Sequence, residues 1–300
     1  MSYSILLALS VLLCIFIYLL SAAKKDPGRA LFTAGAAALS GLFFARLVFV
    51  LSDLDFFIGR THDALSFFWL TDGGFSLLGA VAGVFIALLI TGKSSGGRAL
   101  RDAASVPLLL FCACSRVLEW TCHRMNFGAE TNALPALLTV ADEYGTKLNV
   151  ALIEGALIVL VISFLLARAG RIKGKLVPFE NALFMLGLVE TLSISLRRDS
   201  YMMWGFVHVE QLGFFLLTAI VIMLASSKTG SWLRGFFIAL FTAGLIVFLE
   251  FALDGRIHVP FAFLKDWADL FWYFLFMHVL AGYALCYFHI SKRAERDQNR

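Results

Sequence analysis

The chain has 300 residues, of which 60% are hydrophobic and 15% are charged, and its formal net charge is +4. This composition, with a mean hydropathy of +0.84, excludes an ordinary soluble protein and predicts an integral membrane protein without a separate soluble domain. The apolar runs approach the roughly 20 residues of a spanning helix, which excludes a transmembrane β-barrel, and the basic residues lie in short loops, which argues against nucleic acid as a partner.

Nine membrane-spanning helices are predicted from the apolar runs, so we expect an all-α, polytopic helical bundle. The predicted ranges are 3–22, 31–52, 74–91, 103–122, 148–168, 177–196, 206–226, 235–253 and 269–290. Lysine and arginine are concentrated in one set of connections, which contains Lys24, Lys93, Lys173, Lys228 and the tail. The positive-inside rule places these segments in the cytoplasm, with the N-terminus outside and the C-terminus inside. The first apolar run has no basic segment before it, so we expect a retained helix rather than a signal peptide.

The second and third spans contain the first candidate site residues. Arg46 lies near the outer end of the second span, where its side chain either reaches to the interface or binds an anionic head group. The segment that follows carries an aromatic run at 67–69, which predicts a stretch that lies on the membrane or dips into it. The third span opens with Gly74 and Gly79, which allow either close helix packing or the close approach of a lipid.

The fourth span contains two charged residues, Arg116 and Glu119, in the stretch PLLLFCACSRVLEWTCHRMNFG. A charged side chain at a bilayer centre costs about 2.5–3.5 kcal/mol on insertion scales, so such residues usually face a bundle interior or a wet cavity. Their spacing places both on one face of the helix, where they can form an ion pair. The pair either holds the bundle together or forms part of a cationic pocket for an anionic lipid head group.

Two further carboxylates follow in the next two spans, Glu154 and Glu190, and Arg197 stands just after the end of the second of these spans. Charges of both signs in several spans predict a shared polar cavity. In the last two spans, only Glu250 interrupts the apolar runs. The five cysteines are an odd number and fit no familiar zinc pattern, so we expect small buried residues and no metal. No nucleotide-binding, hydrolase or zinc-protease motif is present, so no cofactor is expected.

Several of these segments occur in the same order as in the bacterial prolipoprotein diacylglyceryl transferase family, which the chain resembles over residues 3–226. GLFFARLVFVL resembles Gly-Ala-Arg-Leu-x-Tyr-Val-Leu, and FFWLTDGGFSLLGAVAG resembles Trp-x-Gly-Gly-Met-Ser-Phe-His-Gly-Gly-Leu-x-Gly. SRVLEWTC stands where the family has Gly-Arg-x-Gly-Asn-Phe. Three later segments, EYGTKLNVALIEGALIVLV, LGLVETLSISLRRDS and VEQL, resemble the family segments that follow.

The resemblance implies an activity in the bacterial cytoplasmic membrane. The family transfers diacylglyceryl from phosphatidylglycerol to the lipobox cysteine thiol of a prolipoprotein and releases glycerol phosphate. The implied partners are phosphatidylglycerol or another anionic phospholipid and the prolipoprotein signal peptide. The reaction needs cations at the phosphate leaving group and a base near the thiol. By position, Arg46, Arg116 and Arg197 match family arginines, and Tyr3 matches a tyrosine of the first helix.

The chain also departs from the family pattern. Leu78 stands at the position of a family histidine, and leucine can neither transfer a proton nor donate a hydrogen bond. Glu119 replaces an asparagine, and Glu190 replaces an arginine. The family has seven spans, so we expect a transferase-like core in residues 1–228, followed by two additional helices and a basic tail in 229–300.

The leading hypothesis is therefore diacylglyceryl transfer, with Arg116 and Arg197 at the head group and Glu119 as the base. The expected site combines the catalytic candidates Glu119, Arg116 and Arg197 with the substrate-binding candidates Arg46, Tyr3, Gly74, Gly79, Glu154 and Glu190. A non-catalytic paralogue that binds lipid or lipoprotein is an alternative. A small-molecule transporter is a third hypothesis, which the absence of an evident internal repeat weakens.

Overall fold

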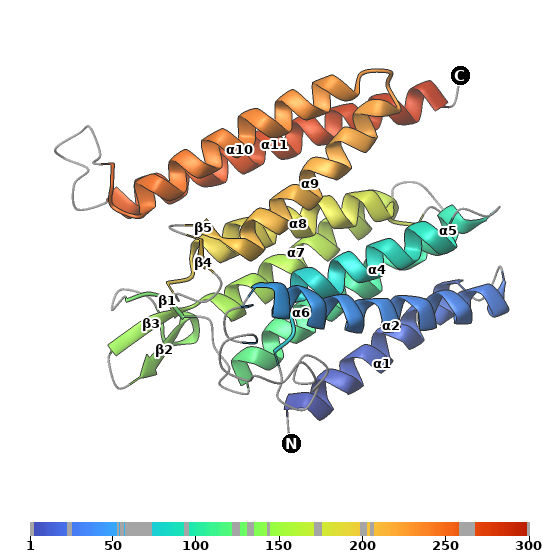
Figure 1. The fold of residues 1–300 in the computed structure, drawn as a ribbon, viewed down its shortest axis with the longest axis horizontal. Helices are drawn as coiled ribbons and strands as arrows, with labels where there is room; N and C mark the ends of the chain where they lie inside the picture. The colour runs from blue at the N-terminus through green and yellow to red at the C-terminus, as the bar shows by residue number, and fades with distance from the viewer. Residues whose placement is uncertain are drawn as a thin grey trace. The chain divides into compact units, whose positions relative to one another are not determined.

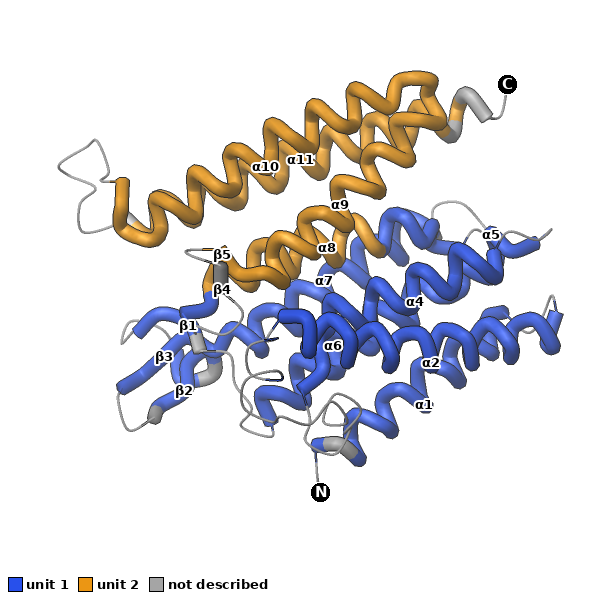
Figure 2. The backbone as a smooth tube through the Cα atoms, in the orientation of Figure 1, with its two compact units in different colours: residues 1–182, 197–202 blue, residues 183–196, 203–300 orange. Residues whose placement is uncertain are grey.

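Long helices dominate the structure (Figure 1). The computed structural model describes residues 3–22, 26–52, 54, 57, 74–92, 96–121, 127–130, 135–142, 145–170, 176–198, 203–204, 207–257 and 268–298. The chain forms two compact units (Figure 2). Unit 1 is Met1–Ala182 with Arg197–Met202, and unit 2 is Leu183–Leu196 with Met203–Arg300.

Unit 1 is a helical bundle in which the long helices are apolar. Its helices are α1 (Tyr3–Ala22), α2 (Pro27–Ser52), α4 (Leu77–Thr91), α5 (Gly97–Ala103), α6 (Ser105–Thr121) and α7 (Val150–Gly170). Helix α2 packs along α4, α6 packs against α7, and α1 contacts both α2 and α6. A helix satisfies its backbone hydrogen bonds internally, so its exposed face can be wholly apolar in lipid. Phe32 and Leu39 on α2 and Leu12 on α1 are exposed in this way.

Small residues allow α2 and α4 to approach closely. A Cβ atom at Gly79 would lie 2.3 Å from the carbonyl oxygen of Phe44, and one at Gly83 would lie 2.3 Å from that of Ser40. The Ser40 hydroxyl donates a hydrogen bond to the Gly83 carbonyl oxygen at 2.9 Å. The predicted close packing at these glycines is therefore confirmed, since any larger residue would push the two backbones apart.

A small antiparallel sheet precedes α7. Its strands are β1 (Phe127–Glu130), β2 (Thr139–Asp142) and β3 (Gly145–Asn149), in the order β1-β3-β2, and the 3-10 helix η2 (Ala136–Leu138) leads into β2. Asn149 ends β3, and its side-chain oxygen accepts a hydrogen bond from the Leu152 N–H at 3.1 Å. This is an N-cap interaction, so the end of the sheet also fixes the start of α7.

Unit 2 contains most of α8 (Phe179–Ser195), the short strands β4 (Met203–Trp204) and β5 (Val207–His208), and three long helices. The long helices are α9 (Val209–Ser227), α10 (Trp232–Leu253) and α11 (Ala268–Gln298). Helix α9 contacts both α10 and α11. Phe184 of α8 stacks on Tyr287 of α11, with ring centroids 3.9 Å apart, and this pair is part of the core of the unit.

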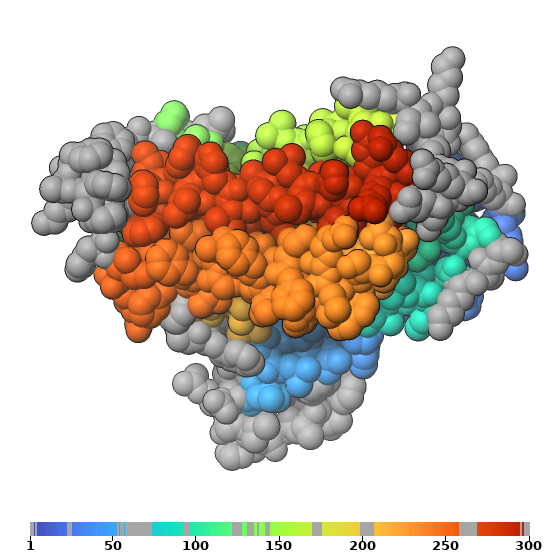
Figure 3. Space-filling view, turned by 90° about the horizontal axis from the view of Figure 1, so that it is seen from above, coloured from blue at the N-terminus to red at the C-terminus, as the bar shows by residue number. Residues whose placement is uncertain are grey.

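Helices α10 and α11 lie side by side, and Figure 3 shows one face of this pair. Large apolar side chains are exposed on both helices, among them Phe237, Phe241, Phe274 and Leu285. Exposed apolar side chains of this kind suit contact with lipid tails rather than water.

The predicted all-α, polytopic membrane bundle is confirmed. Among the described residues, seven helices are long and apolar enough to cross a membrane, while α4, with 15 residues, is apolar but shorter. The fourth predicted span, 103–122, corresponds to α6, and α5 lies just before it. The two helices meet at Ala104, whose N–H donates a hydrogen bond to the Arg101 carbonyl oxygen at 3.0 Å. Helix α11 continues past the predicted end at residue 290 to Gln298.

The prediction of buried cysteines is confirmed in part, and several other predictions concern residues that the structure does not describe. Cys14 and Cys112 are buried as expected, but Cys286 is exposed on α11. The aromatic run 67–69, Cys122 and the basic residues Lys24, Lys93 and Lys173 lie outside the described residues.

Candidate functional site

A carboxylate of α7 binds two arginines inside unit 1. Glu154 is fully buried, and its Oε1 accepts a hydrogen bond from Nε of Arg116 on α6. Its Oε2 accepts a second bond from Nη2 of Arg197 at 3.1 Å. Arg197 follows the C-terminus of α8 and is 8% exposed, and Arg116 is 3% exposed. One carboxylate therefore holds two buried guanidinium groups close together.

Arg116 also pairs with Glu119 on the same helix. Its Nη1 donates to Oε1 and Oε2 of Glu119 at 3.1 and 2.9 Å. The ion pair that the three-residue spacing predicts is therefore confirmed. The Glu119 side chain is 19% exposed, while that of Glu154 is 0% exposed, so Glu119 lies at the accessible edge of the group. We call Arg116, Glu119, Glu154 and Arg197 the ion network.

The ion network depends on close contact between α6 and α7. Gly155, next to Glu154, faces α6: a Cβ atom there would lie 3.4 Å from Cγ2 of Val117 and 3.6 Å from the carbonyl oxygen of Ala113. A larger residue at this position would increase the distance between the two helices and between Glu154 and Arg116. A small residue beside a buried acid is thus part of the geometry of the site.

A guanidinium group is chemically suited to bind anions. A guanidinium has five N–H donors in a planar fork, more than one carboxylate can accept. It also matches the geometry of phosphate oxygens. In a low-dielectric interior, fixed donors of this kind stabilise a developing negative charge more strongly than water does. Phosphate binding at the ion network stays a prediction.

Arg46 occupies a different part of unit 1. Its Nη1 donates to the Gly74 carbonyl oxygen at 3.1 Å, and its guanidinium lies over the rings of Phe49 and Phe57, 5.6 and 5.4 Å from their centroids. The residue is only 6% exposed, so its side chain is buried within the protein, and its position relative to the membrane interface stays a prediction. Burial under aromatic rings stabilises the charge through cation–π contacts.

Gly74 and Gly79 shape the chain around Arg46. Gly74 has φ +75°, a conformation that favours glycine, and a Cβ atom there would lie 2.2 Å from the Phe49 ring. The Ser76 N–H bonds to the Ala45 carbonyl at 3.0 Å, which holds the segment before α4 against α2. Both glycines therefore serve close packing in this structure, and their contact with substrate stays a prediction.

The remaining candidates are distributed over both units. Tyr3 is half-buried at the first residue of α1, and Leu78 is half-buried in the first turn of α4. Glu190 lies on α8 in unit 2 and is fully buried. Their roles in binding stay predictions.

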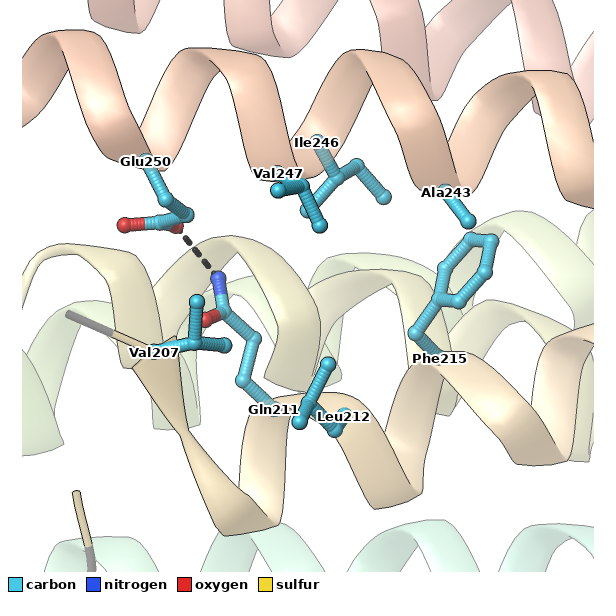
Figure 4. Close-up of a pocket in the computed structure, with 8 residues that line it drawn as sticks. All are labelled: Val207, Gln211, Leu212, Phe215, Ala243, Ile246, Val247 and Glu250. Carbon is cyan, nitrogen blue, oxygen red and sulfur yellow. Dashed lines mark hydrogen bonds between the residues drawn. The ribbon is translucent and has the colours of Figure 1, made fainter. Parts of the chain in front are cut away.

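A second buried polar pair lies in unit 2, between α9 and α10 (Figure 4). Gln211 donates through Nε2 to Oε1 of Glu250, and also to the Thr191 carbonyl at 3.2 Å. Figure 4 shows Val207 beside this pair and Phe215 at the other end of the same apolar pocket, next to Ala243.

Sequence reasoning missed the Gln211–Glu250 pair. In the sequence, only Glu250 interrupts the last two apolar runs, and Gln211 at the start of α9 is the polar residue that could have indicated its partner.

One comparison with known proteins identifies a family. A family model described as prolipoprotein diacylglyceryl transferase matches residues 1–247. This match contains all four residues of the ion network and ends before Glu250. No curated protein matches the chain.

Proposed function

Because the chain belongs to the prolipoprotein diacylglyceryl transferase family, we propose that it transfers diacylglyceryl from phosphatidylglycerol to the lipobox cysteine of a prolipoprotein. The chain is a multi-pass membrane protein, so both substrates can reach it from the bilayer. Within this proposal, Arg116 and Arg197 bind the phosphate of the lipid head group, and Glu119 accepts the thiol proton.

The observation that carries the proposal is the pair of guanidinium groups on Glu154. Their shared carboxylate keeps Arg116 and Arg197 close enough to serve one phosphate. The phosphate gains negative charge when it leaves as glycerol phosphate, so positioned cations lower the barrier of this step. Glu154 is then a positioning residue, since it acts through the two arginines.

The proton step requires a base near the thiol. Glu119 takes the proton from sulfur, the thiolate attacks the glyceryl carbon, and a C–S bond forms as the C–O bond to phosphate breaks. The electron pair of that bond stays on the phosphate oxygen of glycerol phosphate. Leu78 has no group that can do this work. Glu119 is the acid of the ion network with the most exposed side chain, which supports its assignment.

The other candidates complete the proposal. Arg46 donates a hydrogen bond to the Gly74 carbonyl oxygen, and we assign both residues, together with Tyr3, to lipid contact. Gly79 and Glu190 are assigned to substrate binding as well. We further propose that residues 1–228 form the transferase-like core and that residues 229–300 are an addition to it. The proposed location is the bacterial cytoplasmic membrane, with the N-terminus outside and the C-terminus in the cytoplasm.

The test uses the purified full chain in vesicles of phosphatidylglycerol with a lipobox peptide. Mass spectrometry should detect the added mass of one diacylglyceryl group on the cysteine, and a peptide with serine in place of that cysteine should stay unchanged. If an established family member modifies the peptide and this chain does not, the transfer proposal is wrong.

A non-catalytic paralogue that binds lipid or lipoprotein is the second candidate. Leu78 at the histidine position favours it, because the most specific proton-transfer group of the family pattern is missing. Binding of phosphatidylglycerol that depends on Arg116 and Arg197, without any transfer, would support this candidate instead.

A further inference from the structure

Glu119 occupies the donor of Arg116 that a bound phosphate would need. Nη1 of Arg116 donates to both oxygens of Glu119, while Nε of the same guanidinium is held by Glu154. The Glu119 side chain is 19% exposed and that of Arg116 is 4% exposed. An anion that approaches the ion network from its accessible edge therefore meets Glu119 before it meets Arg116.

The charges of the ion network add to this competition. Two guanidinium groups face two carboxylates, so the group as a whole is neutral and attracts an anion weakly. A phosphate at Nη1 would also lie beside the negative charge of Glu119, and like charges at that distance repel. Both obstacles disappear when Glu119 becomes neutral, because the network then has a net positive charge.

We propose that Glu119 gates the phosphate site: it holds Nη1 of Arg116 while it is charged and releases it to phosphate when it takes up a proton. The identity of the proton donor, the cysteine thiol, rests on the proposed function. In that reaction the proton leaves sulfur for a Glu119 oxygen, and the C–S bond forms as the C–O bond to phosphate breaks. Glu119 loses one negative charge in the same event in which the phosphate gains one.

This gate couples the removal of the thiol proton to the departure of the phosphate. The leaving phosphate needs Arg116 most strongly at the moment when the thiol has given up its proton, and the gate supplies the donor at that moment. Asparagine, which the family pattern has at this position, is always neutral and cannot act in this way. The gate is therefore a property that the Glu119 substitution gives to this chain.

The test measures binding of glycerol phosphate to the purified full chain by titration calorimetry, without any acceptor peptide. Glu119→Gln keeps the size of the side chain and removes the competing charge, so glycerol phosphate should bind about 10- to 100-fold more tightly than to wild type. Glu119→Asn should have the same direction of effect. Arg116→Gln in the Glu119→Gln background should abolish the gain.

The matched control is Glu130→Gln. Glu130 is exposed on β1, opposite Lys147 of β3, so this variant removes one carboxylate from unit 1 away from the ion network. Because Glu130 is not part of the ion network, the affinity of this variant for glycerol phosphate should equal that of wild type. Thermal unfolding checks that each variant is folded. If one of the two Glu119 variants does not fold, the other still allows the measurement.

The proposal also predicts how kcat and KM change together. Glu119→Gln should lower kcat for transfer and also lower KM for phosphatidylglycerol, a combination that general damage to the fold does not produce. Unchanged or weaker binding of glycerol phosphate in both Glu119 variants would overturn the gate. Because that binding is measured without transfer, tighter binding in a chain that shows no transfer would support the gate and contradict only the proposed enzyme activity.

Discussion

Glu154 of α7 and Arg116 of α6 form an ion pair in which both side chains are almost completely removed from solvent. Glu154 also binds Arg197, so a single carboxylate neutralises parts of two buried cations. Separating charges from water is costly, and only complete pairing offsets that cost. We therefore expect the loss of Glu154, the buried inner acid, and the loss of Glu119, the partly exposed outer acid, to change the stability of the protein by different amounts.

The inner acid should be the more important one for stability. We expect Glu154→Gln to lower the free energy of unfolding by about 3–5 kcal/mol, because it removes the buried carboxylate that Arg116 and Arg197 share. Glu119→Gln should cost less, about 1–2 kcal/mol, since Glu119 is partly exposed and Arg116 keeps Glu154. Thermal and denaturant unfolding in detergent measures both variants. Equal losses would show that Glu154 is not the central residue of the network.

The glycines of α4 provide a second test. Gly79→Ala places a Cβ atom 2.3 Å from the Phe44 carbonyl oxygen, so α2 and α4 must move apart. Overpacking of this kind costs about 1–3 kcal/mol. Gly35→Ala is the matched control in α2, because nothing lies within 4 Å of its Cβ position. We expect the control to be neutral or slightly stabilising, since alanine favours a helix over glycine. A similar loss at both positions would contradict the close packing.

The Gln211–Glu250 pair of unit 2 predicts non-additive effects. Gln211→Leu and Glu250→Leu should each destabilise the protein by about 1–3 kcal/mol, because each leaves one polar partner buried without the other. The double replacement should cost less than the sum of the single ones, because it strands neither group. A double-mutant cycle on unfolding midpoints gives the coupling. Strict additivity would mean that the two side chains do not interact in the membrane.

These contacts show how far the sequence alone can lead. Apolar runs of sufficient length predict the helices, and a spacing of three residues predicts the pair of Arg116 with Glu119, because both depend on local geometry. The pair of Arg116 with Glu154 spans 38 residues and depends on how α6 and α7 pack, which local spacing does not determine. The sequence therefore indicates Glu154 as a candidate but does not show that it binds both Arg116 and Arg197.

The small sheet was missed for a related reason. Strands β1, β2 and β3 have only four or five residues each. Runs this short contain too few residues for a clear alternation of apolar and polar side chains, so hydrophobic periodicity does not identify them as strands. Their pairing, like the Gln211–Glu250 contact, is set by tertiary structure.

The topology of the chain is a separate prediction from the distribution of basic residues. Reporter fusions at Lys173 and at the C-terminal tail should report the cytoplasm, and a fusion at Tyr144 should report the outside. The tail and Lys173 belong to the basic set of connections, whereas Tyr144 belongs to the opposite set. A tail found outside would require one span fewer or one more than predicted.

The last prediction concerns the chemistry of transfer itself. Glu119→Gln keeps the hydrogen-bonding size of the side chain but removes the base, so the rate should fall by about 10²–10⁴-fold, the usual contribution of a positioned base. Arg116→Lys should also reduce the rate, because an ammonium is a point charge that cannot reproduce the planar fork of donors. Leu78→Ala is the control, since a side chain without a proton-transfer group has no step to lose, and its rate should stay within a few-fold of wild type. Transfer is measured as the mass gain of a lipobox peptide in phosphatidylglycerol vesicles. If wild type is active and Glu119→Gln is equally active, the proton goes to another group, and the assignment of Glu119 as the base is wrong.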